Sequence, residues 1–568
     1  MTEKVWLKHY PNYIRANLDY EEIPLQQFLT NAARNTPEKI AIHFMGKDIK
    51  YKELHESALK FAQYLQQLGI EKGDRIALML PNTPQTVISY YGALYAGATV
   101  VMTNPLYTER EIEYQLKDSG AKVIVSLDIL YPRIMKVFKN TALENVIITS
   151  IKDYLPFPKN LLYPYVQKKE QGVQVHVAHS GVSHQFMEIL KTSQAIEPTI
   201  DFNFEEDLAL LQYTGGTTGF PKGVMLTHKN LIANTRMCAE WLTEPNAQSE
   251  PPVILGILPI FHVYGMTTVL LYTVMQGGKM VLLPKFNAEM ILKTIQKQRP
   301  TLFPGAPTIY IGLINHPQIK KYDLSSIKAC ISGSAPLPAE VQEQFEELTG
   351  GKLVEGYGLT ESSPVTHANL LFENIRQKNS IGIPWPDTDA MIVDGSIERP
   401  RANGEIGELV VKGPQVMKGY WNRPEENAMT LEDGWLKTGD LGYMDDDGFF
   451  YVVDRKKDVI IAGGYNIYPR EVEEVLYEHP DVVECVAAGV PDPYRGETVK
   501  AYIVLREGAT TTEADLNKFC RENLAAYKVP RIYEFRAELP KTAVGKILRR
   551  ALIDEEKEKQ QQPRQEQA

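Results

Sequence analysis

The chain has few cysteines, no long hydrophobic run and no excess of positive charge. Its four cysteines lie far apart in 568 residues and form no Cys-x-x-Cys pair. This pattern excludes a disulfide framework and a zinc site on paired cysteines, so we expect reduced thiols. The longest apolar stretches, residues 253–258 and 269–275, fall well short of the ~20 residues that span a bilayer.

The charge balance and the first residues narrow the class of protein further. A net charge of −10 argues against a general nucleic-acid binder, which needs a basic surface to displace counterions. Residues 1–6 lack the apolar core of a secretory signal. We therefore expect a cytoplasmic protein whose membrane contact is at most peripheral. The oligomeric state stays open, with a homodimer as one alternative.

The first 450 residues alternate helical and strand patterns. Leu54, Ala58, Phe61, Leu65 and Leu68 recur at spacings of four and three, which predicts one face of a helix, and a strand is expected next over 75–80. Alternation at this pace predicts parallel sheets with crossover helices on their faces. Ligands of such sheets lie at the carboxyl ends of strands.

The pattern changes near residue 454. The charged run 454–458, taken alone, indicates a solvated turn; helix 470–477, strands 482–488 and 499–505, and helix 513–527 are expected after it. The predicted fold class is α/β. A large N-terminal domain (residues 1–453) has parallel or mixed sheets with helices on both faces, and a small mobile α+β C-terminal domain covers 459–553. Residues 554–568 are poor in apolar side chains and are predicted to be disordered.

Residues 153–165 interrupt this alternation. They mix aromatic residues and leucines with prolines and lead to Lys168 and Lys169. One interpretation is a membrane-surface contact, with apolar side chains at the lipid boundary and lysines at the headgroups. The other is a proline-stiffened loop folded onto the core. We favour the loop, because the prolines should prevent a regular amphipathic helix.

A glycine- and threonine-rich loop follows the strand expected over 208–213. Its backbone N–H groups and hydroxyls, followed by one lysine, suit a triphosphate. The order of residues differs from a Walker A loop, which needs Gly-Lys-Ser/Thr. The candidate phosphate-binding residues are Thr214, Gly215, Gly216, Thr217, Thr218, Gly219 and Lys222.

Five further segments carry residue types that complete a nucleotide site. Hydroxyl and carboxylate oxygens suit Mg²⁺ bridging substrate phosphates, and small residues let a planar ring approach the backbone. A lone histidine among apolar residues is by itself more often a core residue. The segments contain His262; Gly333, Ser334, Ala335 and Pro336; Glu355, Gly356, Tyr357, Thr360 and Glu361; Asp440; and Lys546.

Together these segments resemble the adenylate-forming superfamily of acyl-CoA synthetases, luciferases and peptide-synthetase adenylation domains, over residues 30–550. The resemblance implies two steps with ATP, Mg²⁺ and CoA. A carboxylate and ATP give an acyl-adenylate and pyrophosphate, and the CoA thiol then displaces AMP. Groups that offset the growing negative charge are needed, because the carboxylate attacks an anionic phosphate.

The resemblance also implies a role for each matching residue. The 214–222 loop would hold the β- and γ-phosphates, with Thr217 and Glu361 at Mg²⁺ and Thr360 at the α-phosphate. The turn 333–336 and residues 355–357 would surround the adenine, and Tyr357 would lie against it. Asp440 and Arg455 would bind the ribose, and Lys546 would bridge the carboxylate and the α-phosphate. His262 would border the acyl pocket.

In such enzymes the two domains are linked by a hinge, here matched to residues 454–458 with the pivot near Lys457. Rotation would replace the Lys546 face by the loop at Gly463 and Gly464, whose small residues leave room for a pantetheine arm. Alternating two closed faces would let one cleft serve two reactions. The charged run would then be the moving part of the molecule.

The acid is the less determined part of this interpretation. His262 stands where amino-acid-activating relatives usually carry aspartate, and Gly215 together with the 433–458 stretch is similar to bacterial long-chain fatty acyl-CoA ligases. The stretches 262–271 and 303–311 could line an apolar tunnel. An aryl (coumarate-like) or medium-chain acyl-CoA ligase is the alternative. A catalytically silent nucleotide-binding protein is disfavoured, because Lys222, Glu361, Asp440 and Lys546 are all present.

Overall fold

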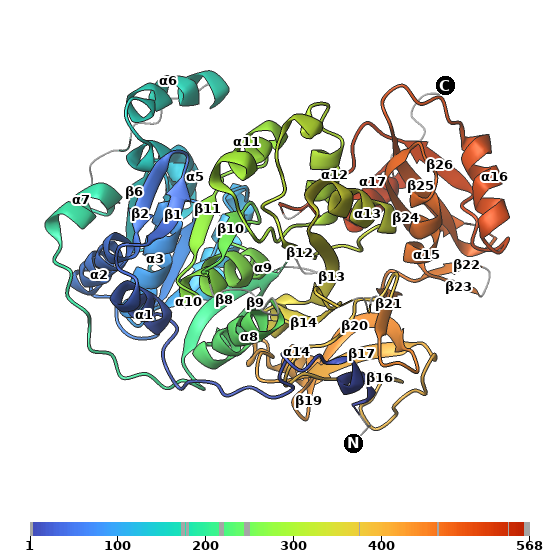
Figure 1. Ribbon diagram of the computed structural model, residues 1–568, viewed down its shortest axis with the longest axis horizontal. Coiled ribbons are helices and arrows are strands. Elements are labelled where there is room, and N and C mark those ends of the chain that lie inside the picture. The colour runs from blue at the N-terminus through green and yellow to red at the C-terminus, as the bar shows by residue number, and fades with distance from the viewer. Residues whose placement is uncertain are drawn as a thin grey trace.

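The computed structural model describes residues 4–171, 177, 181–214, 221–242, 250–373, 375, 377–462, 465–492, 494–543 and 545–561. An eight-stranded sheet forms the centre of the N-terminal half (Figure 1). Its strands, in spatial order, are β18 (Gly419–Tyr420), β9 (Lys222–Thr227), β8 (Leu208–Thr214), β4 (Thr99–Met102), β3 (Arg75–Met79), β5 (Val123–Leu127), β6 (Asn145–Thr149) and β7 (Ser183–Gln185). The strands from β8 to β7 run parallel, and β9 and β18 extend one edge in antiparallel pairing.

Helices cover both faces of this sheet. Ile76 and Leu78 of β3 share a core with α2 (Tyr51–Gln67) and α3 (Pro84–Tyr95). Ala77 and Met79 share another core with α4 (Glu109–Ser119) and α5 (Tyr131–Phe138). Because successive side chains of a strand point to opposite faces, the two helix pairs lie on opposite sides, as expected from the sequence.

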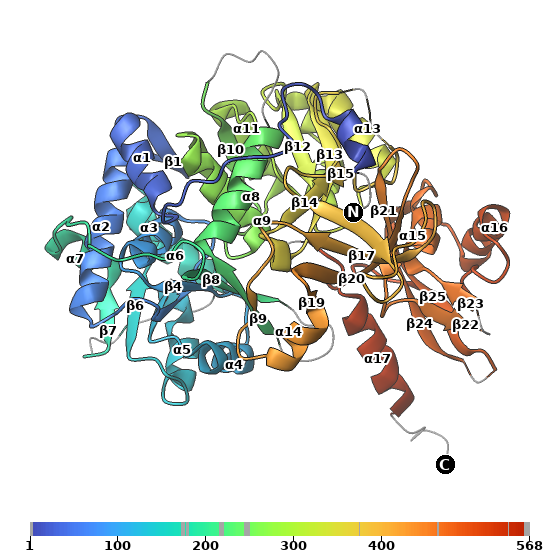
Figure 2. The same cartoon turned by 90° about the horizontal axis from the view of Figure 1, so that it is seen from below.

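Three smaller sheets complete the N-terminal half (Figure 2). The first is β10 (Val253–Gly256), β11 (Lys279–Leu282), β1 (Ile40–Phe44) and β2 (Lys47–Lys50). The second is β12 (Ala329–Ser332), β13 (Lys352–Gly358), β14 (Val365–Ala368) and β15 (Ile383–Pro384). The third is β16 (Asp389–Val393), β17 (Gly407–Lys412), β20 (Trp435–Met444) and β19 (Leu431–Glu432), with β21 (Phe450–Arg455) paired to β20.

The C-terminal region has a sheet and a core of its own. The sheet contains β23 (Tyr465–Ile467), β22 (Ile460–Ala462), β25 (Gly496–Leu505), β24 (Val482–Asp492) and β26 (Ile532–Phe535). Helices α15 (Pro469–Tyr477) and α16 (Glu513–Asn523) contribute Val472 and Leu516 to this core, which is separate from the N-terminal ones. Helix α17 (Arg549–Gln561) ends the described chain.

The remaining helices connect these layers. They are η1 (Val5–His9), α1 (Gln27–Asn35), η2 (Asp128–Leu130), η3 (Ile151–Tyr154), α6 (Lys159–Gln171), α7 (Phe186–Thr192), α8 (His228–Trp241), α9 (Val263–Gly265), the π-helical turn η4 (Met266–Leu271), α10 (Tyr272–Met275), α11 (Ala288–Gln298), α12 (Pro307–Ile314), η5 (Ile319–Lys321), α13 (Ala339–Thr349), η6 (Thr360–Ser362) and α14 (Pro424–Thr430). Among the described residues, none of the helices combines the length and the apolar character that crossing a membrane requires.

The structure corrects three expectations. Residues 159–171 form helix α6 although Pro164 lies inside it, so the prolines do not prevent a helix. A proline removes one backbone hydrogen bond, and here the remaining turns tolerate that loss.

The predicted disordered tail is helical as far as residue 561. Leu552 of α17 is fully buried, and Glu556 accepts a hydrogen bond from Lys500 at 2.8 Å, so packing and charge hold a segment poor in apolar residues. The third expectation, a solvated turn at the charged run 454–458, is wrong for its first residue, because Asp454 is only 6% exposed. All four cysteines are buried free thiols, as expected.

Candidate functional site

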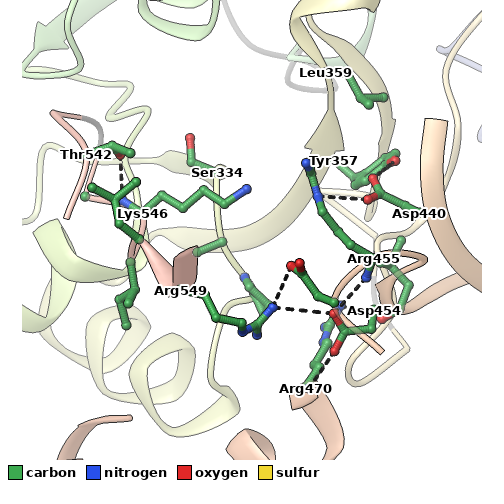
Figure 3. A pocket seen from close by; sticks show the side chains of 18 of the residues that line it. Ser334, Tyr357, Leu359, Asp440, Asp454, Arg455, Arg470, Thr542, Lys546 and Arg549 are labelled. Carbon is green, nitrogen blue, oxygen red and sulfur yellow. Dashed lines mark hydrogen bonds and ion pairs between the residues drawn. The ribbon is translucent and has the colours of Figure 1, made fainter. Parts of the chain in front are cut away.

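A cleft of about 2080 Å³ lies where the C-terminal domain faces the N-terminal domain. The carboxyl-terminal end of β13, the β20–β21 pair and the first turn of α12 line it on the N-terminal side. The turn that carries Lys546 lines it on the other side (Figure 3). The cleft therefore brings together residues as far apart in the sequence as Lys222 and Lys546.

Asp440 is the centre of a polar trio on the N-terminal wall. Strand register places it directly opposite Arg455, and its Oδ1 lies 3.1 Å from Arg455 Nε. The Tyr357 hydroxyl donates to Asp440 Oδ2 at 2.6 Å. Asp440 is 3% exposed, so both partners compensate a buried carboxylate. Burial and the Asp440 charge raise the pKa of Tyr357, which keeps its proton on the hydroxyl.

The turn after β12 presents backbone to the same wall. Ser334 has φ of +72°, a left-handed conformation that is uncommon for a residue with a side chain. A Cβ on Gly333 would lie 3.0 Å from the Tyr264 ring, so a small residue is needed there. The Leu337 N–H donates to Glu355 Oε2 at 3.0 Å and ties this turn to β13. The predicted turn 333–336 and residues 355–357 are thus contiguous in space.

A second group lies around Glu361, on η6. The Tyr420 hydroxyl donates to Glu361 Oε1 at 2.8 Å. Lys222 Nζ lies 5.1 Å from the centre of the Tyr420 ring and 2.6 Å from Glu426 Oε2. Lys222 is thus held near Glu361 but paired with another carboxylate, and an incoming polyanion would compete with Glu426 for it.

Lys546 stands on a tight turn of the C-terminal domain. Its backbone N–H donates to the Thr542 hydroxyl at 3.1 Å, and its carbonyl accepts from the Thr542 N–H at 2.8 Å. Gly545 has φ of +81°, and a Cβ there would lie 2.1 Å from Thr308 Oγ1 on α12. Only glycine lets the turn approach the N-terminal domain this closely. The Arg455 charge, and then enclosure by the cleft, lower the pKa of Lys546 to about 8.

His262 borders the apolar part of the cleft. Burial, and then the Lys546 charge, lower its pKa to about 4, so the imidazole is neutral at pH 7. Its Nδ1 accepts from the Tyr264 N–H at 3.3 Å. Pro307 and Ile311 of α12 line the cleft as well. The π-helical turn η4 begins four residues after His262, and such turns often mark functional sites.

Arg470, at the start of α15, connects the domains. Its guanidinium donates to the Val452 carbonyl at 2.7 Å, and its Nη2 lies 3.8 Å from Glu355 Oε1. Its N–H donates to Asp454 Oδ2 at 2.9 Å. Arg470 is 9% exposed, and burial raises the pKa of Glu355. The segment around Glu355 is therefore tied to the C-terminal domain by a buried cation.

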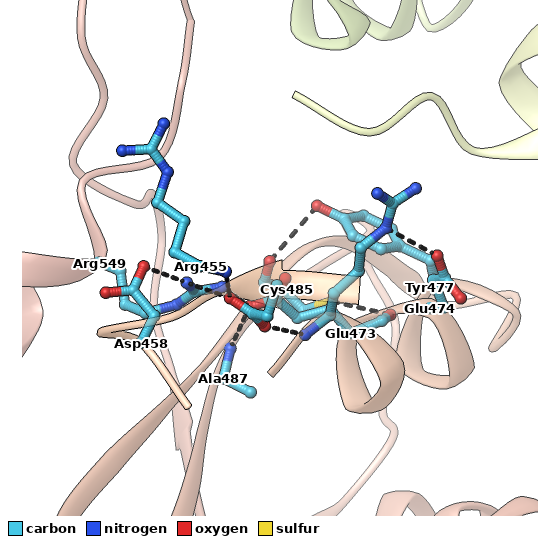
Figure 4. A network of polar contacts seen from close by, with 10 residues as sticks. Arg455, Asp458, Glu473, Glu474, Tyr477, Cys485, Ala487 and Arg549 are labelled. Carbon is cyan, nitrogen blue, oxygen red and sulfur yellow. Dashed lines mark hydrogen bonds and ion pairs between the residues drawn. The ribbon is translucent and has the colours of Figure 1, made fainter. Parts of the chain in front are cut away.

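Arg549 forms a second link, between the charged run and α15 (Figure 4). Its Nη1 donates to Asp458 at 2.9 Å and its Nη2 donates to Glu473 at 2.8 Å. Glu473 also accepts from the Ala487 N–H at 2.7 Å. Burial raises the pKa of Asp454 to about 6, while burial and the Arg455 charge lower the pKa of Lys457 to about 8.

The described cleft contains most of the predicted site residues. They are Lys222, His262, Gly333, Ser334, Ala335, Pro336, Glu355, Gly356, Tyr357, Thr360, Glu361, Asp440, Arg455, Lys457 and Lys546, together with Thr214. Gly215, Gly216, Thr217, Thr218, Gly219, Gly463 and Gly464 lie outside the described residues. Within the described ranges no group of three His, Cys, Asp or Glu side chains could hold a metal ion.

Tyr420, Glu426, Arg470 and Arg549 are polar neighbours of the site that sequence reasoning missed. Tyr420 meets Glu361 across 59 positions, a separation that no local pattern reveals. Arg549 follows Lys546 by three residues, and this adjacency was the one available signal.

Comparison with known proteins identifies both halves of the chain. The family model for the AMP-binding enzyme matches residues 29–421, and that for the AMP-binding enzyme C-terminal domain matches 471–546. A long-chain-fatty-acid–CoA ligase of Bacillus subtilis (strain 168) is 57% identical over 98% of this chain and 99% of its own. A feruloyl-CoA synthase of an Amycolatopsis species is 35% identical, over 91% of this chain and 96% of its own.

Solved structures of similar proteins superimpose on most of the chain. The crystal structure of ATP-bound MatB from Rhodopseudomonas palustris superimposes with a TM-score of 0.81 at 30% identity, over 94% of this chain and 98% of that one. The apo crystal structure of the same protein, with the same coverage, gives a TM-score of 0.72 at 29% identity. The present chain thus superimposes better on the ATP-bound structure than on the apo structure.

Proposed function

The chain belongs to the AMP-binding enzyme family, and from this membership we propose that it is a long-chain-fatty-acid–CoA ligase. The observation that carries the proposal is the full-length identity to the Bacillus subtilis ligase, which exceeds the identity to the feruloyl-CoA synthase. The polar trio at Asp440 and the position of Lys546 in one cleft support the chemistry. A neutral His262 beside an apolar wall suits a fatty acid better than an amino acid.

In the first step a carboxylate oxygen bonds to the α-phosphorus of ATP, and the bond from that phosphorus to the pyrophosphate oxygen breaks. Lys546, a cation below pH 8, lies where it can offset the charge of both reacting anions. The Asp440 carboxylate accepts hydrogen bonds from the ribose hydroxyls, and the turn at Gly333 and Ser334 lies along the adenine. Lys222 leaves its ion pair with Glu426 and pairs with the β- and γ-phosphates.

Mg²⁺ fits this site as an ion held mainly by the substrate. It takes oxygen ligands and usually binds one or two protein carboxylates plus phosphates. Glu361 is the described carboxylate for it, and the Tyr420 hydroxyl orients that group. Thr217, the other predicted ligand, lies outside the described residues. When bound, the ion neutralises charge that develops on the leaving pyrophosphate.

In the second step the CoA sulfur bonds to the acyl carbon, the bond from that carbon to the AMP oxygen breaks, and the thiol proton is released. We place the hinge at 454–458 with its pivot at Lys457, between an N-terminal domain (1–453) and a C-terminal domain (459–553). Lys546 leaves the cleft in this rotation, and the 463–464 loop takes its place. The present arrangement, with Lys546 inside, corresponds to the first step.

One assay tests the activity and the substrate class. The purified protein is given ATP–Mg²⁺ with acetate, octanoate, palmitate, oleate or coumarate, and pyrophosphate and AMP are measured with and without CoA. We expect the highest kcat/KM for palmitate or oleate, and AMP release that depends on CoA. Preference for coumarate would replace the fatty-acid assignment, and absence of turnover with every acid would refute the ligase.

A cytoplasmic location, a homodimer and a peripheral membrane contact remain predictions. Buried free thiols and the substrates ATP and CoA support the cytoplasmic location. Light scattering during size-exclusion chromatography measures the oligomeric state, with twice the 64.2 kDa chain mass expected for a homodimer.

A further inference from the structure

Large apolar side chains of helix α6, and of Phe157 just before it, are exposed to solvent. Phe157 is 78% exposed, Leu161 61%, Leu162 56%, Tyr165 76% and Val166 47%. These five residues are called the α6 apolar face. Single exposed apolar residues are ordinary, but five within ten positions form a patch of the kind that marks an interaction surface.

The opposite side of α6 attaches the helix to the protein. Gln167 donates to Asp128 Oδ1 at 3.2 Å, and Tyr163 packs against the main core. Lys159 Nζ donates to the Met45 carbonyl, in the turn between β1 and β2, at 3.1 Å. Because residues four apart share one face of a helix, Leu161 lies beside Tyr165, and Leu162 beside Val166. The apolar side is thus directed outward by contacts on the other side.

Exposed lysines lie before and after this face in the sequence. Lys152, Lys168 and Lys169 are exposed, and the 151–171 stretch has only two acidic residues, Asp153 and Glu170, in a chain whose net charge is −10. The Asp153 carboxylate is used within the fold, since it accepts from the Ser150 N–H and the Thr149 hydroxyl at 2.8 Å. The surface therefore combines an apolar centre with local positive charge, which suits an anionic lipid surface.

The place of α6 in the molecule fits such a contact. Both views put α6 in the part of the N-terminal domain that is far from the C-terminal domain (Figures 1 and 2). A surface bound at α6 would leave the C-terminal domain free to rotate between the two steps. A site next to α15 or α17 would not.

We propose that the α6 apolar face docks the enzyme on an anionic lipid bilayer, where it takes up long-chain acid dissolved in the membrane. The proposal rests on the ligase function only for the identity of that acid. A two-fold contact between copies fits less well, because it would place the same lysines of both chains in one interface. A bilayer containing anionic headgroups accepts both the apolar side chains and the lysines.

Vesicle flotation tests the docking without using enzyme activity. Wild type is mixed with phosphatidylcholine vesicles that contain either no or half phosphatidylglycerol. We expect it to float with the anionic vesicles and to float at least about fivefold less with the neutral ones, because each lysine near an anionic surface contributes to binding. Flotation of the variant Leu161→Ser/Leu162→Ser/Tyr165→Ser should fall about tenfold, because the variant lacks the apolar side chains that would be buried in the bilayer. Lys168→Glu/Lys169→Glu should lose only the preference for anionic lipid.

The matched control is Tyr494→Ser/Ile532→Ser, which removes two exposed apolar side chains from the C-terminal domain, 95% and 40% exposed, and should float like wild type. Turnover of octanoate in vesicle-free buffer should be equal in all variants, whereas turnover of palmitate supplied in vesicles should fall with flotation. Wild type that does not float, or an α6 triple variant that floats normally, would overturn the proposal. A triple variant that changes from dimer to monomer and still floats would also overturn it, because the α6 apolar face would then be a contact between copies of the chain. If the triple variant fails to fold, the lysine pair decides.

Discussion

The two walls of the cleft are built in different ways. On the N-terminal wall, Tyr357 belongs to β13, whereas Asp440 and Arg455 belong to the paired strands β20 and β21, whose register sets Asp440 opposite Arg455. On the C-terminal wall, Lys546 stands on a turn, and among the described residues no acidic side chain lies within ion-pair distance of its ammonium group. The contact of that turn with the N-terminal domain depends on Gly545 against Thr308.

The difference matches the roles that we propose for the two walls. A group that holds the nucleotide through both steps can be fixed by strands and by buried hydrogen bonds. A group that acts in one step and then leaves has to approach closely without strong bonds of its own. Its position is set elsewhere, by Arg470 and Arg549 near the hinge.

Lys546→Ala should give the largest difference between the two half-reactions. We expect adenylate formation, measured as pyrophosphate release, to fall about 10³-fold, in the range known for loss of one preorganised charge-stabilising group. Conversion of supplied acyl-adenylate to acyl-CoA should change less than about threefold, because in the rotation that we propose Lys546 leaves the cleft before this step. Lys541→Ala, which removes an exposed lysine of the same turn, is the control. Equal loss of both half-reactions would contradict the division of work between the walls.

Asp440→Asn should affect both steps, because its wall serves both. We expect kcat/KM for ATP to fall about 100-fold, since a hydrogen bond to a charged group contributes ~1.5–3 kcal/mol and Arg455 loses its partner. Capture of supplied acyl-adenylate should weaken to a similar extent. Asp446→Asn, an exposed aspartate near the same sheet, should leave both unchanged. An effect of Asp440→Asn on only one half-reaction would show that this wall too is specific to one step.

The same contrast explains what could be predicted from the sequence. Asp440, Tyr357 and Glu361 lie in short motifs at strand ends, and their chemistry could be recognised locally. The alternating pattern around β3 predicted the doubly covered sheet. Arg470 lies in no such motif. Its role depends on contacts with Glu355, more than a hundred positions away, and with Val452, about twenty positions away.

The two element-level errors have physical causes as well. Residues 555–561 lack a hydrophobic pattern, but Glu556 and Lys559 are held by ions of distant strands, so long-range charge replaces local burial. In α6, proline propensity suggested a loop, but a helix can lose one hydrogen bond and persist when one side packs against the protein.

Arg470→Gln should loosen the contact between the two domains without changing either wall of the cleft. The variant loses the cation that joins Glu355, Val452 and α15, so the arrangement of the first step becomes less populated. We expect adenylate formation to fall about 20-fold, or about 1.8 kcal/mol, a moderate value for a partly compensated buried pair. Thioester formation from supplied acyl-adenylate should be unchanged or faster. Arg550→Gln, at an exposed neighbour of Arg549, should alter neither rate. A 20-fold loss in both steps, or a fall in Tm that parallels it, would assign Arg470 to folding instead.

The pH dependence of the first step gives the smallest effect and the most direct view of the mobile wall. The Arg455 charge lowers the pKa of Lys546 to about 8, so the reactive cation is present at pH 7 and is lost as the pH rises through 8. Adenylate formation should therefore fall about tenfold between pH 7 and pH 9, as expected for one titrating group. Lys457 has a similar pKa of about 8, so two variants are needed to assign the change. Lys546→Arg, which stays charged, should shift the fall above pH 10, whereas Lys457→Gln should leave it near 8. A fall that follows Lys457 would move the pH-sensitive group from the reacting atoms to the hinge.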